Sequence, residues 1–140
     1  MMMDTDIKKL IPQRDPIIQV DRLLKVEDNQ AETSLVITKE NFFIDEDQLF
    51  AEPGLIEHIA QSASAFAGYQ AIQQGATNPP VGYIGEVKRF HCYRRPAVGE
   101  ELHTTIMMGA EVAGVTLLTG ETFVGEEKVA DTQMKIFVES

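Results

Sequence analysis

The stretch Pro53-Gly54-Leu55-Ile56-Glu57-His58-Ile59-Ala60-Gln61 opens the one segment of this chain that predicts a long helix, from Gly54 to about Gln74. Pro-Gly is a common helix start, Gly75 stands where the helix would end, and Pro79-Pro80 would prevent its return. Apolar residues recur at helical spacing, namely Leu55, Ile59, Ala63 and Phe66. Small residues dominate positions 60–68, so we expect a sheet to pack closely around this helix.

Extended segments lie on both sides of the predicted helix. Two β-rich runs, residues 17–26 and 31–38, are separated by Asp28-Asn29 and predict a hairpin. Residues 41–52 predict an ordered loop with a short turn. Four more strands are expected after the helix, at residues 81–94, 102–112, 115–124 and 128–138. One antiparallel sheet curled around one helix accounts for this order, so the sequence predicts a single α+β domain over residues 1–140.

Composition excludes several classes of function. The 140 residues include 12 Lys and Arg against 22 Asp and Glu, a net charge of −10, which is unsuited to binding nucleic acid or anionic membranes. A single cysteine, Cys92, excludes an internal disulfide and a Cys-rich metal site. No stretch reaches the roughly 18 apolar residues that span a membrane, and the first residues do not resemble a signal peptide. We therefore expect a cytoplasmic protein.

Several segments together resemble the hotdog-fold 3-hydroxyacyl-[acyl carrier protein] dehydratases of fatty-acid synthesis. Residues 10–22, LIPQRDPIIQVDR, are similar to the opening of that family. Residues 53–61 resemble the start of its central helix, with Glu57 and Gln61 at the matching sites. Residues 94–102, RRPAVGEEL, resemble its basic-Pro-x-x-Gly-acid turn, and the later strands match in length and order. The resemblance covers nearly the whole chain and implies the hotdog fold, a curved antiparallel sheet wrapped around one long central helix.

The chain departs from that family at two histidines. Gln13 stands where the family usually has His, and residues 42–53 contain no counterpart of the family's Gly-His-Phe-Pro-Gly loop. The interval from Pro-Gly to the acidic residue is also about two residues shorter. In these respects the chain looks more like the dehydratase-like proteins of aryl-polyene gene clusters, some of which lack the loop histidine.

The resemblance implies that Glu57 is a catalytic acid. Dehydration of a 3-hydroxyacyl thioester requires a base for the α-proton, an acid for the departing hydroxyl and donors for the developing enolate oxygen. Near the helix N-terminus, Gly54 and Leu55 would offer free N–H groups to the thioester oxygen. The alternative for Glu57 is a solvated first-turn residue stabilised by the helix dipole.

The base has few candidates, because the chain has three histidines. His58 adjoins Glu57 and is kept as a candidate catalytic residue, although helix neighbours diverge by about 100°. His91 alternates with Phe90 and Cys92, and His103 lies on another predicted strand. The alternative for each is an ordinary polar or hydrogen-bonded histidine.

Gln61, Ser64 and Gly68 continue the helix face of Glu57. The resemblance implies that Gln61 helps to hold the acid and that the small residues leave room for an acyl chain. The alternative is close packing against neighbouring segments. With Gly54 and Leu55, Gln61 and Ser64 are the predicted substrate-binding residues.

The charges suggest how a partner would dock. Residues 40–87 hold seven acidic residues and no Lys or Arg, after which Lys88, Arg89, Arg94 and Arg95 fall within eight positions. Carrier proteins are acidic and their phosphopantetheine carries a phosphate, which Arg side chains suit. These four residues are the predicted carrier-protein docking site, the alternative being a solvated strand end. No metal or resident cofactor is expected, since phosphopantetheine arrives on the substrate.

Three functions follow from these observations. The first is a 3-hydroxyacyl-ACP dehydratase in fatty-acid or aryl-polyene synthesis, with Glu57 as acid and the base unidentified. The second is a non-catalytic or half-site subunit that pairs with an active dehydratase paralogue. The third is an acyl thioesterase that uses Glu57. The substrate is an acyl carrier protein or acyl-CoA thioester, and we expect a homodimer or a heterodimer with a hotdog paralogue, joined edge to edge.

Overall fold

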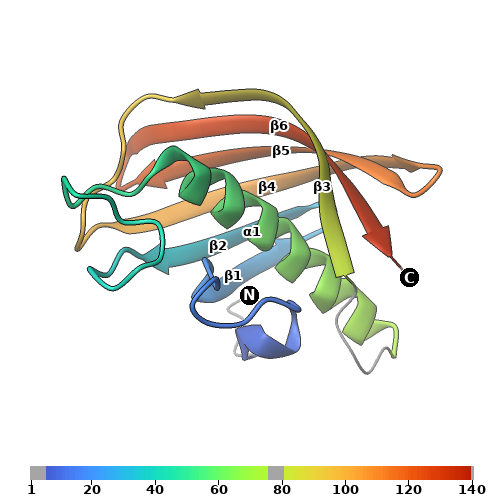
Figure 1. The fold of residues 1–140 in the computed structure, drawn as a ribbon. Helices are drawn as coiled ribbons and strands as arrows, with labels where there is room; N and C mark the ends of the chain where they lie inside the picture. The colour runs from blue at the N-terminus through green and yellow to red at the C-terminus, as the bar shows by residue number, and fades with distance from the viewer. Residues whose placement is uncertain (1–5, 76–80, 140) are drawn as a thin grey trace.

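One antiparallel sheet curves around one long helix (Figure 1). The computed structural model describes residues 6–75 and 81–139. The helix is α1 (Glu52–Gln73), preceded by a short 3-10 helix, η1 (Ile7–Lys9). The six strands are β1 (Arg22–Glu27), β2 (Gln30–Val36), β3 (Val81–Cys92), β4 (Glu101–Val112), β5 (Val115–Val124) and β6 (Glu127–Glu139). The predicted α+β architecture is confirmed.

The strand order is β1-β2-β4-β5-β6-β3, so β1 and β3 form the two edges. The β4–β5 turn has φ of 54° at Ala113 and 81° at Gly114, and the β1–β2 turn has φ of 47° at Asp28. Such left-handed backbone is what two-residue hairpin turns require. Both edge strands are irregular, because β-bulges interrupt the pairing of β1 once and that of β3 twice.

The first hairpin is shorter than expected. Residues 17–20 were predicted to belong to its first strand, yet β1 begins at Arg22. The reason is that the backbone of Gln19 bonds to helix side chains: its N–H donates to Gln61 Oε1 and its carbonyl accepts from His58 Nδ1. This segment therefore runs across α1 and not along the sheet. The Pro79-Pro80 pair lies outside the described residues.

The core lies between α1 and the inner face of the sheet. Its largest fully buried side chains include Ile59 and Phe66 of α1 and Ile106, Leu118 and Met134 of the central strands. On β5, a Cβ at Gly120 would lie 2.6 Å from Ile59 Cγ2. Glycine at this position therefore lets the helix approach the sheet closely.

The sheet covers one side of α1, and the N-terminal segment covers another. A Cβ at Gly68 would collide with the backbone carbonyl of Leu10, and Leu10 and Ile11 are themselves buried. Figure 1 shows this segment, in blue, lying against the helix. The expectation of a helix enclosed by sheet is thus corrected, since small residues at positions 60–68 also admit the N-terminal segment.

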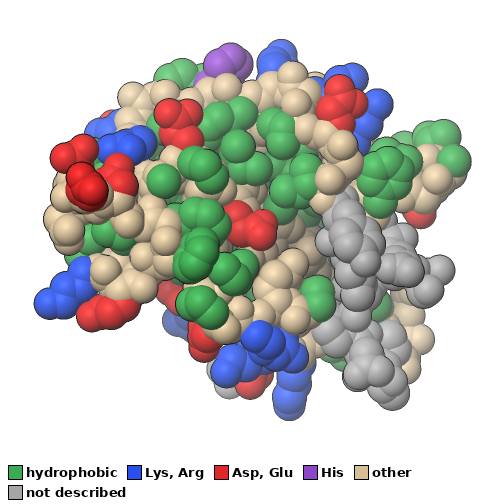
Figure 2. Space-filling model, in the orientation of Figure 1, with side chains coloured by type: hydrophobic (Ala, Val, Ile, Leu, Met, Phe, Trp, Pro, Cys, Tyr) green, Lys and Arg blue, Asp and Glu red, His purple; other side chains and the backbone are tan. Residues whose placement is uncertain are grey.

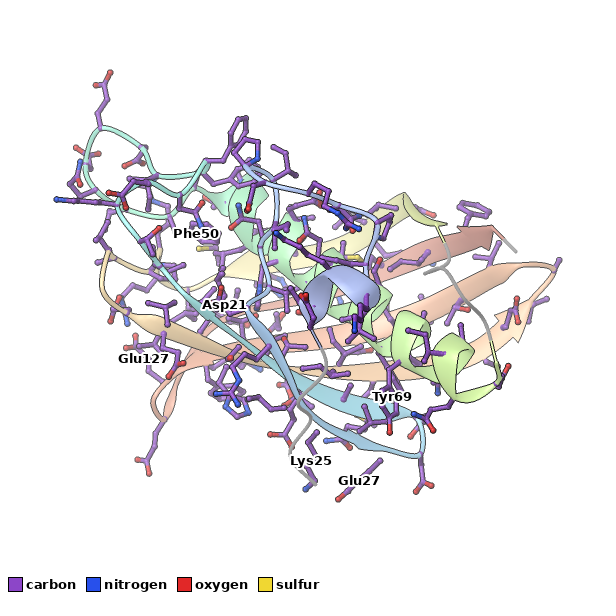
Figure 3. All side chains as sticks on the ribbon, turned by 90° about the horizontal axis from the view of Figure 1, so that it is seen from below. Asp21, Lys25, Glu27, Phe50, Tyr69 and Glu127 are labelled. Atoms are coloured by element: carbon purple, nitrogen blue, oxygen red, sulfur yellow. The ribbon has the colours of Figure 1, made fainter. Side chains whose placement is uncertain are left out.

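Residues 41–51 form the predicted ordered loop, tied by isolated bridges from Ile44 to Phe50 and from Leu49 to Ala97. Phe50 lies at the end of the molecule where α1 begins, and Tyr69 lies near the other end of the helix (Figure 3). Within the described parts of the chain, no helix is both long and apolar enough to cross a membrane.

Candidate functional site

Glu57 lies in the second turn of α1 and is half-buried. It forms no hydrogen bond or ion pair with another described residue. In the view where α1 faces the reader, hydrophobic side chains gather at the centre with acidic groups among them (Figure 2). The Glu57 carboxylate is thus partly exposed and has no partner among the described residues.

His58 points from α1 to the sheet and is fully buried. Its Nδ1 lies 2.6 Å from the carbonyl oxygen of Gln19, and its Nε2 lies 2.7 Å from Thr104 Oγ1. A carbonyl oxygen can only accept, so Nδ1 carries a proton and donates it. Burial lowers the pKa of His58 to about 4, so the ring is neutral at physiological pH and Nε2 accepts from Thr104.

This assignment fixes the direction of a buried hydrogen-bond chain. Thr104 donates its single hydroxyl proton to His58, so it accepts from Thr122, whose Oγ1 lies 2.8 Å away. Both ring nitrogens of His58 are therefore engaged inside the fold. The structure does not bring His58 and Glu57 to a common reactant, and neither nitrogen is free to act as a base.

The other two histidines lie on the outer face of the sheet. His91 Nδ1 is 3.0 Å from Asp131, which also accepts from the Tyr93 hydroxyl at 2.7 Å. His103 Nε2 is 2.7 Å from Glu32. A shallow hollow of about 280 Å³ lies beside His91, and Glu57 does not line it. This chain therefore brings none of its three histidines to Glu57.

At the start of α1 the expectation of free N–H groups is wrong. The N–H groups of Gly54 and Leu55 both donate to the carbonyl of Ala51, at 2.9 and 3.3 Å. Gly54 is also enclosed, because a Cβ there would lie 2.7 Å from both Phe43 and Phe50. Glycine is needed here for close packing of the loop on the helix. That Gly54 and Leu55 bind substrate stays a prediction.

Gln61 is fully buried and holds the N-terminal segment. Its Oε1 accepts from the backbone N–H of Gln19 at 2.6 Å, and its Nε2 donates to the carbonyl of Ile17 at 2.8 Å. It does not bond to Glu57. Ser64, one turn further along, is half-buried. Gln61 and Gly68 are both packed closely against the N-terminal segment, as the alternative of close packing predicts. Substrate binding by Gln61 and Ser64 stays a prediction.

The predicted docking cluster divides into two parts. Arg94 forms ion pairs with Glu100 and Glu127 at 2.8 and 3.0 Å, and its hydrogen bonds hold the pKa of Glu100 below its usual range. Arg95 pairs with Asp45. Lys88 and Arg89 are exposed on the edge strand β3 and make no ion pair with another described residue. That the four residues dock a carrier protein stays a prediction, and Lys88 and Arg89 are the two of the four without an ion pair among the described residues.

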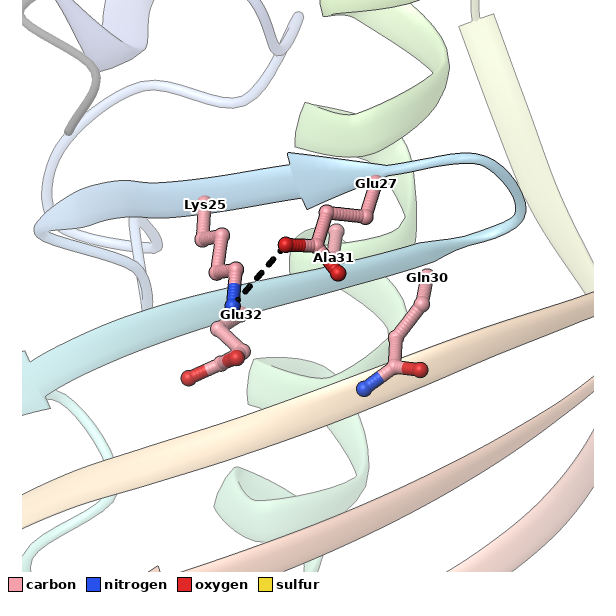
Figure 4. A pocket seen from close by; sticks show the side chains of 5 residues that line it. All are labelled: Lys25, Glu27, Gln30, Ala31 and Glu32. Carbon is pink, nitrogen blue, oxygen red and sulfur yellow. Dashed lines mark ion pairs between the residues drawn. The ribbon is translucent and has the colours of Figure 1, made fainter. Parts of the chain in front are cut away.

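No group of three or more His, Cys, Asp or Glu side chains that could hold a metal ion occurs in residues 6–75 and 81–139. A recess of about 10 Å³ lies at the β1–β2 hairpin (Figure 4). Its lining residues are Lys25, Glu27, Gln30, Ala31 and Glu32. Lys25 and Glu27 form an ion pair of 3.0 Å there. The recess has room for about one water molecule.

Sequence reasoning did not single out Gln19, Asn41 or Thr104, which surround the buried part of this region. Gln19 bonds to α1 through its backbone, and its side-chain Oε1 accepts from Asn41 at 2.8 Å. One available signal was a glutamine inside the apolar run Ile17-Ile18-Gln19-Val20, where a buried polar side chain needs partners. Nothing in the sequence placed Asn41 or Thr104 beside it.

Comparison with known families gives one match over nearly the whole chain. A family model described as ApeP dehydratase, ApeP-like, matches residues 5–140. A search of curated proteins found no match.

Solved structures show the same fold at low sequence identity. The dehydratase heterocomplex ApeI:P from Xenorhabdus doucetiae matches with a TM-score of 0.91 and 13% identity, covering 99% of this chain and 93% of that chain. The PaaI protein of the Escherichia coli phenylacetic acid degradation operon matches with a TM-score of 0.66 and 11% identity, covering 82% and 80%. The protein smu.793 of Streptococcus mutans, bound to acetyl CoA, matches with a TM-score of 0.67 and 10% identity, covering 88% and 90%.

Proposed function

Because the chain belongs to the ApeP-like dehydratase family, we propose that it dehydrates 3-hydroxyacyl thioesters as one half of a two-subunit active site. Glu57 is the catalytic acid of this site, and a partner hotdog subunit supplies the base. The observation that carries the proposal is the placement of the three histidines. His58 is buried with both ring nitrogens bonded, and His91 and His103 lie on the outer face of the sheet.

The proposed reaction divides its proton transfers between two subunits. The partner's base removes the proton from C2 of the acyl chain, and the electron pair forms the C2–C3 double bond as the C3 hydroxyl departs. Glu57 gives its proton to that hydroxyl, which leaves as water. The proton taken by the base returns to Glu57 through solvent before the next turnover. No oxidant, metal or resident cofactor is needed, and phosphopantetheine is part of the substrate.

The edge strand β3 is the proposed surface for the partner. Ile84 and Val87 are 39% and 37% exposed. Their pairing partners on β6, Ile136 and Met134, are buried, so all four lie on the inner face of the sheet. The helix of this chain leaves these two side chains uncovered. A second hotdog subunit would cover them and extend the sheet. The ApeI:P structure is a heterocomplex, which supports a paralogue as partner.

The proposed substrate arrives on an acyl carrier protein or as an acyl-CoA in the cytoplasm. Lys88 and Arg89 lie on the same edge strand and are the free cations of the basic cluster. An acidic carrier protein or a CoA phosphate would be attracted there on a chain whose net charge is −10. The acetyl CoA bound by smu.793 supports a thioester of this kind.

Replacing Glu57 by glutamine tests the acid. We expect the isolated chain to give no turnover of a 3-hydroxyacyl N-acetylcysteamine thioester, and the pair with a dehydratase paralogue from the same organism to form the enoyl product. A heterodimer also has a second site, which would need its base from this chain. Because this chain offers no base, only the site with Glu57 is active, and Glu57→Gln should lower turnover by about 100-fold or more. Ultraviolet absorbance of the enoyl thioester measures the rate.

Glu52→Gln is the matched control, because Glu52 is an exposed carboxylate in the first turn of the same helix. It should leave turnover unchanged. Full activity of the isolated wild-type chain would disprove the shared site, and full activity of the Glu57→Gln pair would disprove the role of Glu57.

A second candidate function is hydrolysis of acyl thioesters. This function is favoured because Glu57 is half-buried and the described chain brings no histidine to it. A carboxylate alone can activate water for attack on a thioester. The same assay mixture distinguishes the two reactions. Release of free thiol, detected with a disulfide dye, indicates hydrolysis, whereas the enoyl product retains its thioester.

A charge placed on β3 should disrupt the pair. Val87 and Leu117 are both 37% exposed, but Val87 lies at the β3 edge on the inner face, whereas Leu117 lies on the outer face of β5. We expect Val87→Glu to weaken association at least about tenfold, because a charge buried in an interface is poorly solvated. Leu117→Glu should have no such effect. Light scattering at micromolar concentration measures the change, and equal association of both variants would place the interface elsewhere.

A further inference from the structure

Gln19 carries a buried polar group that the fold does not use. The residue is 0% exposed. Its backbone N–H, its carbonyl and its side-chain Oε1 each have a hydrogen-bond partner. Its Nε2 has none among the described residues. An amide nitrogen buried without a partner destabilises the folded protein. An apolar residue of similar size would avoid this cost.

The orientation of the Gln19 amide is fixed by its neighbour. Asn41 Oδ1 accepts from the backbone N–H of Phe43 at 2.9 Å, so the Asn41 Nδ2 group faces the other way. That Nδ2 donates to Gln19 at 2.8 Å, and the atom that receives it must be the oxygen. The unpartnered atom of Gln19 is therefore an N–H donor and requires an acceptor.

Gln19 lies against the turn of α1 that carries Glu57. His58, the next residue after Glu57, binds the Gln19 carbonyl at 2.6 Å. Gln61, one turn beyond Glu57 on the same helix face, binds the Gln19 N–H at 2.6 Å. Two short contacts thus hold Gln19 rigidly over this turn. Asn41 belongs to the loop that packs on Gly54, at the start of the same helix.

We propose that Gln19 Nε2 donates a hydrogen bond to the carbonyl oxygen of the bound acyl thioester. This inference rests on the proposed function and identifies the donor of its site. The N–H groups of Gly54 and Leu55, which would otherwise have held this oxygen, are both bonded to Ala51. Gln19 provides a donor that is unpartnered among the described residues, on the segment that bonds to His58 and Gln61, which follow Glu57 on α1. When the α-proton is removed, negative charge collects on the carbonyl oxygen, and a donor already in place stabilises it.

Gln19→Leu tests the proposal through two measurements, of which only one should change strongly. Thermal stability should change little, because removal of the unpartnered Nε2 offsets the loss of the hydrogen bond from Asn41 to Oε1. Affinity for a 3-hydroxyacyl pantetheine amide, in which nitrogen replaces the thioester sulfur and blocks hydrolysis, should fall about tenfold. Calorimetry on the protein in the oligomer in which it purifies gives the affinity, and the melting temperature gives the stability.

Gln13→Leu is the matched control, because Gln13 Oε1 is a second buried amide atom without a partner. It should keep full affinity for the probe. If the wild-type protein binds the probe and Gln19→Leu binds it equally well, the Gln19 assignment is wrong and the proposed function stands. If Gln13→Leu lowers affinity as much as Gln19→Leu, the loss is unspecific and the assignment is again wrong. If the wild-type protein does not bind the probe, both proposals are wrong.

Discussion

Replacing Gly68 by alanine should destabilise the protein by about 3 kcal/mol, although alanine is the better helix former by about 1 kcal/mol. The added Cβ would overlap the backbone carbonyl of Leu10, which cannot rotate away as a flexible side chain could. The N-terminal segment must then move off the helix. Leu10 and Ile11 are 1% and 0% exposed, and uncovering each costs about 1.5–3 kcal/mol. Urea denaturation followed by circular dichroism measures the loss.

The neighbouring position supplies the control for Gly68. Ala67→Gly lowers helix propensity by about 1 kcal/mol and introduces no collision. We expect Gly68→Ala to be the more damaging of the two, which reverses the order that helix propensity predicts. A Gly68→Ala protein that unfolds at higher urea than the wild type would show that the N-terminal segment does not pack on this face.

Acid should weaken the protein through His58, beginning below about pH 6.5. The folded-state pKa is lowered to about 4 by burial, whereas the unfolded chain has the ordinary value of 6.5. Between pH 6.5 and pH 4 the unfolded state binds a proton at His58 and the folded state does not, so the free energy of unfolding falls as pH falls. At one pKa unit per 1.36 kcal/mol, the loss reaches about 2 kcal/mol by pH 5 and about 3 kcal/mol by pH 4.

Denaturation curves between pH 7 and pH 5 measure this effect before most carboxylates titrate. His58→Gln removes the titrating ring, so the stability of this variant should be nearly constant from pH 7 down to pH 5. At pH 7 the variant should be less stable than the wild type, because the buried hydrogen-bond partners of His58 lose a bond. His91→Gln is the control, because His91 is exposed on the outer face. It should keep the wild-type slope. The same acid slope in His58→Gln would assign the effect to other groups.

Much of the fold was predictable because its signals are local. The helix follows from Pro53-Gly54 and a run of regularly spaced apolar residues, and the observed helix begins two residues earlier than expected. The turn at Asp28-Asn29 follows from residues that tolerate positive φ, and Asp28 is found with that backbone. The last strand was expected at residues 128–138 and is observed at Glu127–Glu139.

The interior of the candidate site was not predictable, because its contacts join residues far apart in the chain. Gln19 and Gln61 are 42 residues apart, and His58 and Thr104 are 46 apart. Hydrophobic periodicity does not predict contacts between residues so far apart in the sequence. Residues 17–20 have the composition of a strand, but the side chains of His58 and Gln61 form hydrogen bonds with the backbone of Gln19. These backbone groups are therefore not available for pairing in the sheet. Tertiary hydrogen bonds here outweigh β-propensity.

The charge cluster shows a similar limit. Four cations within eight positions suggested one docking surface, yet Arg94 pairs with Glu100 and Glu127, and Arg95 pairs with Asp45. Glu127 is 33 residues from Arg94 in the chain. Spacing along a sequence shows that charges are near one another, whereas their availability depends on what the fold places opposite them.

The irregular edges of the sheet have a consequence for the lifetime of an unpartnered subunit. A straight exposed edge strand can recruit further copies without limit and so seed fibrils. On β3 the ladder is broken beside Ile84 and again beside Lys88, and on β1 it is broken between Leu23 and Lys25. An arbitrary strand cannot match such an edge, whereas a partner with complementary irregularities can. The chain should therefore resist aggregation while it awaits assembly, and heated samples should stay free of thioflavin-positive material.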